Sequence, residues 1–164
     1  MDMAKQNNLI PVDRMDAPHS KQSLRLWLKL LGCTTVVEKR LRARMDADFS
    51  TTLPRFDVLA ALERHPEGLK MSALSEFLMV SNGNVTGVIT RLIEEGFVTR
   101  TVDHDDRRSA TGRLTRKGRD EFLKMAAANE IWMDTMFSDL SDRQIEDLMR
   151  LLGHLRHSID AHLV

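Results

Sequence analysis

The chain has 164 residues, enough for one compact domain with a buried core. Its 24 basic residues equal its 24 acidic ones, which excludes a polybasic chain that binds any polyanion, so nucleic-acid binding would require segregated charges. The single cysteine excludes an intramolecular disulfide framework, and we see no apolar run of membrane-spanning length and no secretory signal. We therefore expect a cytoplasmic protein with no membrane partner.

The first predicted helix begins near Ser20 and ends between Asp46 and Ser50. Residues 1–19, which precede it, show no sustained apolar period, and we interpret them as an N-terminal arm. The helix carries two apolar stripes on different sides, and a helix that is apolar on two sides needs two partners. One stripe holds Leu24, Leu28, Leu31 and Thr35, and the other holds Leu26, Leu30, Cys33, Val37 and Leu41.

The middle of the chain predicts three helices followed by a β-hairpin. Thr52 and Pro54 are typical of a helix start, and the turn residues 65–68 end that helix. Two short helices follow at 71–79 and 82–95, and Gly96 stands where a left-handed C-cap is expected. The β-branched segment 97–102 and the segment 110–115 are predicted strands, joined by the polar turn 103–109.

Two more helices complete the chain. Thr115 is a predicted N-cap, and Ser141 with Gln144 forms a capping-box pattern that opens the last helix. That helix has a heptad-like apolar repeat at Ile145, Leu148, Leu152, Leu155 and Ile159. The expected fold is mainly α with a small β-hairpin wing: a winged helix-turn-helix region at 51–115 and a helical dimerisation region at 20–50 and 116–164. A monomeric all-α core that absorbs both stripes is the alternative.

The helix predicted at 82–95 is the candidate for contact with DNA. In a winged helix-turn-helix the second helix of the motif enters the major groove and the hairpin lies beside it. Small polar or base-contacting types occupy the side of this helix opposite Val85, Val88, Ile89 and Leu92; they are Ser81, Asn82, Asn84, Thr86, Thr90 and Arg91. An ordinary solvated amphipathic helix would show a similar pattern.

The turn 103–109 favours the DNA interpretation. Arg107 and Arg108 follow three aspartates there, and bases outnumber acids between Arg91 and Arg119. An arginine at a hairpin tip, oriented by Asp106 two positions before Arg108, suits insertion into a narrow, electronegative minor groove. A surface turn whose charges neutralise each other is the alternative.

The segments 69–75, 81–86, 91–98, 103–109 and 114–118 together resemble the MarR family of transcriptional regulators, over about residues 20–159. The resemblance implies an obligate dimer built by the first, fifth and last helices. It also implies that the helix at 81–95 contacts the major groove of a double-stranded operator, that Arg108 enters the minor groove, and that Asp106 positions it. Two residues depart from the family pattern: Met79 stands where a glycine is frequent, and Gly112 replaces a branched residue.

The segments 26–31 and 51–57 resemble the subgroup of this family that responds to hydroxycinnamoyl-coenzyme A thioesters or related aromatic catabolites. The resemblance implies a small aromatic or acyl-CoA effector that releases a repressor from its operator. The candidate ligand-binding residues are Trp27, Leu31, Arg55, Phe56 and Leu59, with Trp27 and Phe56 as an apolar floor and Arg55 attracting an anionic group. In the alternative, the two aromatic residues are simply core residues.

Other functions have weaker support. Cys33 lies within an apolar stripe and the chain has no tyrosine to orient a thiol, so we expect a buried, inert cysteine rather than a redox sensor. His154, His157 and His162 on the last helix make metal sensing conceivable, but isolated histidines are commoner, and we predict no metal site and no cofactor. No catalytic motif is present, so we expect no enzyme. A winged-helix protein-interaction module, or a regulator that senses another signal, stays open.

Overall fold

A computed structural model describes residues 18–77, 82–102 and 110–162. The chain divides between Ala43 and Arg44 into two compact units, which are described separately. The first unit holds most of the long helix α1, Pro18–Phe49. Its large apolar side chains are exposed in the single chain; they include Leu24, Leu26, Trp27, Leu28, Leu31 and Val36. Cys33 is exposed as well. The prediction of a buried thiol is therefore wrong for the single chain, because an apolar stripe does not specify what covers it.

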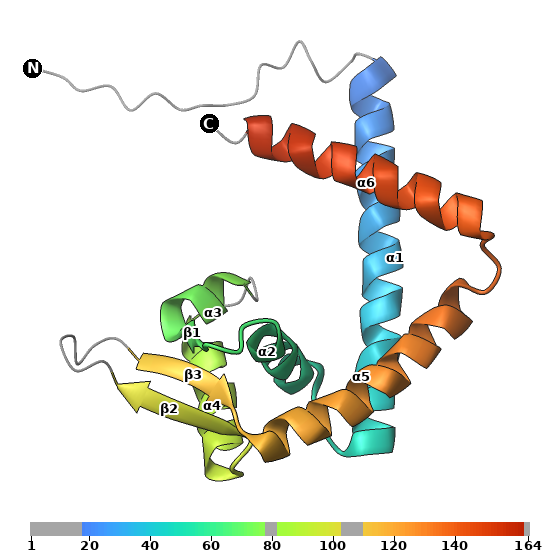
Figure 1. The fold of residues 1–164 in the computed structure, drawn as a ribbon. Helices are drawn as coiled ribbons and strands as arrows, with labels where there is room; N and C mark the ends of the chain where they lie inside the picture. Colours follow the sequence, from blue (N-terminus) through green and yellow to red (C-terminus); the bar gives the residue numbers. More distant parts are fainter. Residues whose placement is uncertain (1–17, 78–81, 103–109, 163–164) are drawn as a thin grey trace, which may run out of the picture. The chain divides into compact units, whose positions relative to one another are not determined.

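The core of the second unit is built around α2, Leu53–Glu63, which is the central helix in Figure 1. The last turn of α1 contributes Met45, which is fully buried, and the chain then turns at Ser50 with a left-handed φ of 50°. Thr52 and Pro54 stand at the start of α2, as predicted. Phe56 and Val58, which point to different sides of the helix, are both buried, so α2 is covered on more than one side.

The sheet has three strands rather than the two predicted. β2, Val98–Val102, and β3, Ala110–Leu114, form the expected antiparallel hairpin. β1, Leu69–Lys70, adds to the other side of β3, so that the order is β1-β3-β2. Gly112 lies at the centre of this register, opposite Leu69 on one side and Arg100 on the other. A two-residue strand has no sequence period, which is why the pattern did not predict β1.

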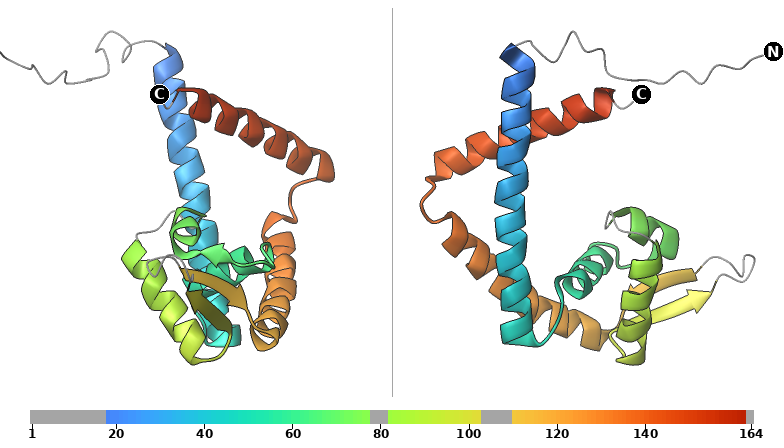
Figure 2. Two further views of the ribbon diagram at one scale, coloured as in Figure 1. Left: turned by 60° about the vertical axis from the view of Figure 1, so that its left-hand side comes forward. Right: turned by 180° about the vertical axis from the view of Figure 1, so that it is seen from behind.

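Two short helices lie between β1 and β2. α3 spans Met71–Phe77 and α4 spans Asn82–Glu94. Ile89 and Leu92 of α4 are buried, and α4 contacts α2, α3 and β2. Gly96 follows α4 with φ 76°, which confirms the predicted left-handed C-cap. Figure 2 shows α4 and the β2–β3 hairpin from two further sides.

The start of α5, Arg116–Phe137, is fixed to the turn that follows α4. Thr115 is the predicted N-cap: its hydroxyl accepts a hydrogen bond from the Gly118 amide at 2.9 Å and donates to the Gly96 carbonyl at 2.8 Å. Gly118 is buried, and a Cβ there would lie 2.0 Å from the carbonyl oxygen of Phe97. The leucine-threonine-x-x-glycine pattern at 114–118 thus describes a tight corner between α4, β2 and α5.

Further along, α5 packs on α2 through aromatic side chains. Phe122 stacks on Phe56 with ring centroids 5.6 Å apart, and Met125 is buried. Trp132 meets Phe49, from the last turn of α1, edge to face at 6.1 Å. These contacts make Phe56 a core residue.

The last helix, α6, spans Asp142–His162 and begins with the predicted capping box. The Gln144 side-chain oxygen accepts from the Ser141 amide at 2.8 Å, and the Gln144 amide donates to the Ser141 hydroxyl at 3.4 Å. No residue of α6 is buried, and several large apolar side chains are exposed: Leu148, Met149, Leu151, Leu152 and Ile159. Within the described ranges, no helix combines the length and the apolarity needed to cross a membrane.

Candidate nucleic-acid interface

One face of α4 is polar and exposed. Thr86, Thr90 and Arg91 are exposed, whereas Ile89 and Leu92 on the opposite side are 1% and 0% exposed. The Thr90 hydroxyl donates to the Thr86 carbonyl at 2.9 Å, a local bond that a competing partner can replace at little cost. Asn82 and Asn84 lie in the first turn of α4. Ser81, Asp106, Arg107, Arg108 and Met79 lie outside the described residues.

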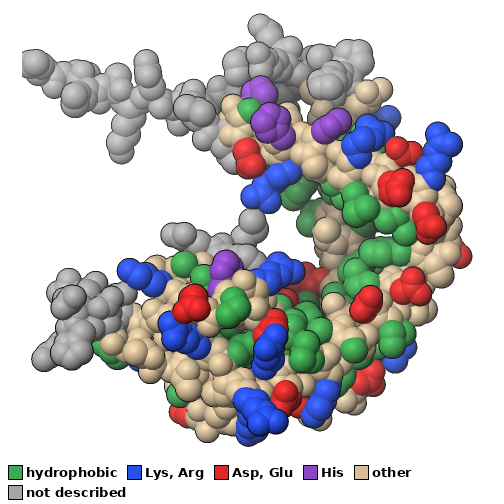
Figure 3. Space-filling model, viewed as in Figure 1, with side chains coloured by type: hydrophobic (Ala, Val, Ile, Leu, Met, Phe, Trp, Pro, Cys, Tyr) green, Lys and Arg blue, Asp and Glu red, His purple; other side chains and the backbone are tan. Residues whose placement is uncertain are grey.

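Among the described residues, two of the basic side chains between residues 91 and 119 are already paired with acids. Arg113 lies 3.6 Å from Glu67, and Arg119 lies 2.9 Å from Glu63. Figure 3 shows Lys and Arg side chains interspersed with acidic ones on the visible surface of the winged helix. No ion pair is found for Arg91 within residues 18–77, 82–102 and 110–162, so its charge is available to an anionic partner.

The carboxyl end of α4 is held by two cations from other helices. Arg55 of α2 binds the Glu95 carboxylate with both terminal nitrogens, one of them at 2.8 Å, in a bidentate geometry. Lys117 of α5 donates to the Glu95 carbonyl at 2.7 Å, and its ammonium lies 4.6 Å from the centroid of the Phe97 ring. The pKa of Glu95 is lowered, first by the hydrogen bond from Arg55, against a smaller opposing effect of burial.

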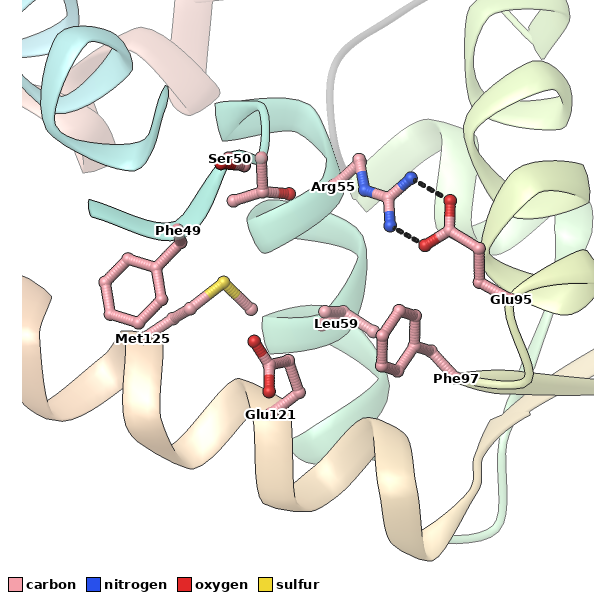
Figure 4. A pocket seen from close by; sticks show the side chains of 9 residues that line it. Phe49, Ser50, Arg55, Leu59, Glu95, Phe97, Glu121 and Met125 are labelled. Atoms are coloured by element: carbon pink, nitrogen blue, oxygen red, sulfur yellow. Dashed lines mark hydrogen bonds and ion pairs between the residues drawn. The ribbon is translucent and has the colours of Figure 1, made fainter. Parts of the chain in front are cut away.

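A pocket of about 150 Å³ lies beside this ion pair, between α2, α5 and the turn after α1. Figure 4 shows the Arg55–Glu95 pair at one wall, with Phe49, Leu59 and Met125 pointing toward the cavity. Glu121 also lines the pocket and pairs with Lys124 at 3.2 Å. The pocket lining therefore combines apolar side chains with charged side chains that are already in ion pairs.

The candidate ligand-binding residues fall in different places. Arg55 and Leu59 line the pocket, whereas Phe56 does not, because it stacks on Phe122. Trp27 and Leu31 belong to the first unit, where they are 56% and 45% exposed. The sequence analysis did not identify Glu95, whose carboxylate accepts hydrogen bonds from the guanidinium of Arg55. The two residues are 40 positions apart in the chain, and no local pattern links them.

The histidines of α6 do not form a recognisable metal site. No group of three or more His, Cys, Asp or Glu side chains that could hold a metal ion is found in the part of the chain that the structure describes. His162 instead hydrogen-bonds the Ser158 carbonyl, one turn earlier, at 2.7 Å.

The comparisons with known proteins agree with this geometry. Residues 51–110 match the model of the MarR family. The chain is 31% identical over 140 residues to the transcriptional activatory protein BadR of Rhodopseudomonas palustris, covering 83% of this chain and 77% of that protein. It is 25% identical over 135 residues to the transcriptional repressor IacR of Pseudomonas putida, covering 82% of this chain and 78% of that protein.

Solved structures show the same fold. A MarR family transcriptional regulator from Silicibacter pomeroyi superposes with a TM-score of 0.74 at 28% identity, covering 88% of this chain and 99% of that one. A mutant MarR from E. coli complexed with operator DNA superposes with a TM-score of 0.71 at 18% identity, covering 82% of this chain and 95% of that one, and this likeness concerns the fold alone.

Proposed function

This chain belongs to the MarR family of DNA-binding transcriptional regulators, and on that premise we propose that it binds a palindromic operator as a homodimer, without catalysing a reaction. The exposed polar face of α4 is the observation that carries the proposal, because buried Ile89 and Leu92 anchor the helix in the core and leave this face outward, as entry into a major groove requires. Two-fold symmetry then places the half-sites about one helical turn, roughly 10 base pairs, apart.

Each candidate contact has a distinct task in this proposal. Asn82, Asn84, Thr86 and Thr90, with Ser81 just before the helix, contact base edges in the major groove, and Arg91 contacts a phosphate. We assign minor-groove contact to Arg108, with Asp106 orienting it and Arg107 adding charge. These wing residues lie outside the described residues, so their assignment depends on the sequence pattern and the family.

The exposed apolar side chains support the homodimer. α6 leaves Leu148 and Leu152 about half exposed, and Leu24 and Leu28 of α1 are more exposed still. Exposed leucines in this number cost free energy in water and are typical of a surface that binds a partner. We therefore propose that residues 20–50 and 116–164 form the dimerisation region, while residues 51–115 bind DNA.

We also propose that a small aromatic effector releases the protein, as a repressor, from its operator. The pocket of about 150 Å³ beside Arg55 and Leu59 has the volume of an engineered protein cavity that holds benzene. It fits one aromatic ring, so the coenzyme A part of an acyl-CoA would stay outside it. Trp27 and Leu31 remain candidates for contacts outside this pocket. Phe56 is packed against Phe122, so we give it a supporting role under the site.

DNA binding is tested by a gel-shift titration with the upstream DNA of the chain's own gene, over a series of salt concentrations. We expect Arg91→Gln and Arg108→Ala to weaken binding, and Thr86→Ala to relax base preference by about 1 to 3 kcal/mol. Arg143→Gln on exposed α6 is the matched control and should change nothing. Absence of specific binding by the wild-type chain would contradict the proposal and favour a protein-interaction module.

The effector is tested by titrating p-coumaric and ferulic acids and their coenzyme A thioesters with and without operator DNA. A ligand releases DNA only if it binds the DNA-free arrangement more tightly, so its affinity must fall when operator is present. Binding that leaves the DNA complex unchanged, or no binding at all, means that the ligand class is wrong. Run-off transcription distinguishes repression from activation, which is the role named for BadR.

A further inference from the structure

The Arg55–Glu95 pair lies at the end of the helix proposed to contact DNA. Arg55 is largely buried, with a side chain 19% exposed, whereas the Glu95 side chain is 44% exposed. Both carboxylate oxygens of Glu95 are engaged by the two terminal nitrogens of Arg55. Figure 4 shows the two side chains approaching from different helices with both contacts drawn. The buried partner is therefore the fixed one, and it determines where the exposed carboxylate lies.

A second cation lies within reach of the same carboxylate. Arg91 is four residues before Glu95, and the Glu95 amide donates to the Arg91 carbonyl at 3.0 Å, so the helical turn extends to Glu95. Side chains four residues apart on a helix are neighbours. Arg91 also contributes to the lowered pKa of Glu95, after the larger effects of Arg55 and Lys117, which agrees with this placement on one helical turn. Lys117 is committed to the carbonyl of Glu95 instead.

We propose that Arg55 is a positioning residue for DNA binding, which keeps the Glu95 carboxylate away from Arg91 and so leaves the Arg91 charge free for a phosphate. The inference rests on the proposed function, since it requires that Arg91 meets DNA. Without Arg55, the cations whose charges act on the Glu95 carboxylate are Lys117 and Arg91, and of these Arg91 shares its helical turn whereas Lys117 is hydrogen-bonded to the Glu95 carbonyl. An Arg91–Glu95 pair neutralises a charge on the DNA-contacting helix, and fewer counterions are then released on binding.

The simplest rival is that the ion pair only braces the end of α4. Both interpretations predict that loss of Arg55 weakens DNA binding, but they differ for Glu95. If the pair is a brace, loss of either partner is equally harmful, and loss of both is no better. If Arg55 controls the charge of Glu95, loss of Glu95 alone is harmless, and loss of both partners restores binding. Glu94 is a second exposed carboxylate near Arg91 in the sequence. It is present in all of these variants, so its effect on DNA binding is the same in each and does not alter the comparison.

The test compares operator affinity and its salt dependence for the wild type, Arg55→Met, Glu95→Gln, the double variant, Arg91→Gln and Arg55→Met with Arg91→Gln. Methionine keeps the apolar stem of the largely buried Arg55 and removes its donors. For Arg55→Met we expect Kd to rise by roughly three- to tenfold and the salt slope to fall by about one for each Arg91 neutralised. Glu95→Gln and the double variant should bind like the wild type.

The double variant decides between the two interpretations. Binding as weak as that of Arg55→Met would overturn the proposal, and so would a further loss of salt slope when Arg55→Met is added to Arg91→Gln. Urea unfolding of every variant shows whether a loss of affinity comes from a destabilised fold. If Arg55→Met is destabilised and its loss of affinity persists in the double variant, the result counts against the proposal. If the wild-type chain binds no DNA, the proposed function fails first, which is a distinguishable outcome.

Discussion

Replacing Leu148 and Leu152 by alanine tests the proposed dimer at the heptad-like apolar repeat of α6. The two residues are one helical turn apart and are 46% and 47% exposed. Full burial of a leucine stabilises by about 2 kcal/mol, so covering the exposed half of each contributes about 1 kcal/mol. A symmetric dimer contains both residues twice, and roughly 4 kcal/mol corresponds to about a thousandfold in the dimer dissociation constant.

Sedimentation equilibrium from nanomolar to micromolar concentration measures this constant. Glu146→Ala with Arg150→Ala is the matched control, because these residues are also four positions apart on α6 but lie about half a turn away from the two leucines. We expect the control to dimerise like the wild type. A wild-type chain that is monomeric at micromolar concentration, or a leucine variant with an unchanged constant, would refute the argument.

Three further predictions concern the DNA-binding unit. Gly118→Ala should lower the free energy of unfolding by about 1 to 3 kcal/mol in urea titrations, because its Cβ would lie 2.0 Å from the Phe97 carbonyl oxygen; an unchanged midpoint would contradict the tight corner. Gly87→Ala meets no atom within 4 Å and should stabilise the chain by up to about 1 kcal/mol in the same assay, yet weaken operator binding in gel shifts if the α4 backbone approaches DNA closely. The pKa of Glu95 is depressed by Arg55, so the stability that this pair contributes, about 1 kcal/mol or less, is present at neutral pH and is lost as pH falls below the ordinary glutamate range. Urea titrations between pH 7 and pH 3 should therefore show a smaller loss for Glu95→Gln than for the wild type, and equal losses would contradict this.

The features that the sequence predicted well depend on neighbouring residues. The Ser141–Gln144 capping box, the left-handed Gly96 and the N-cap at Thr115 are each specified within a few positions, and the structure confirms all three. The pairing of β2 with β3 is of the same kind, since the β-branched residues of β2 and the polar sequence between the two strands predicted it. Local chemistry therefore predicted the helices, the hairpin strands and their order, and with them the fold class.

The features that the sequence missed depend on distant partners. The β1–β3 pairing joins Leu69 to Gly112 by backbone hydrogen bonds that no side-chain pattern encodes. Glu95 meets Arg55 only because α2 and α4 pack together. The prediction for Cys33 failed for a related reason: an apolar stripe shows that a surface needs a cover, but it does not show whether the same chain supplies it.

The corner at Thr115 and Gly118 fixes the orientation of α5 about its own axis relative to the winged helix. The first turn of α5 is joined to the turn after α4 through the Thr115 hydroxyl, the Thr115 amide and the close approach of Gly118 to the Phe97 carbonyl, so these two elements turn together. α5 has 22 residues and is about 33 Å long, so it acts as a lever whose far end moves much further than the corner. A single residue inserted in the middle of α5 would rotate everything beyond it by about 100° and leave the winged helix intact. If the chain binds its operator as the proposed dimer, the spacing of the half-sites that it accepts depends partly on the length of this helix, far from the residues proposed to meet DNA.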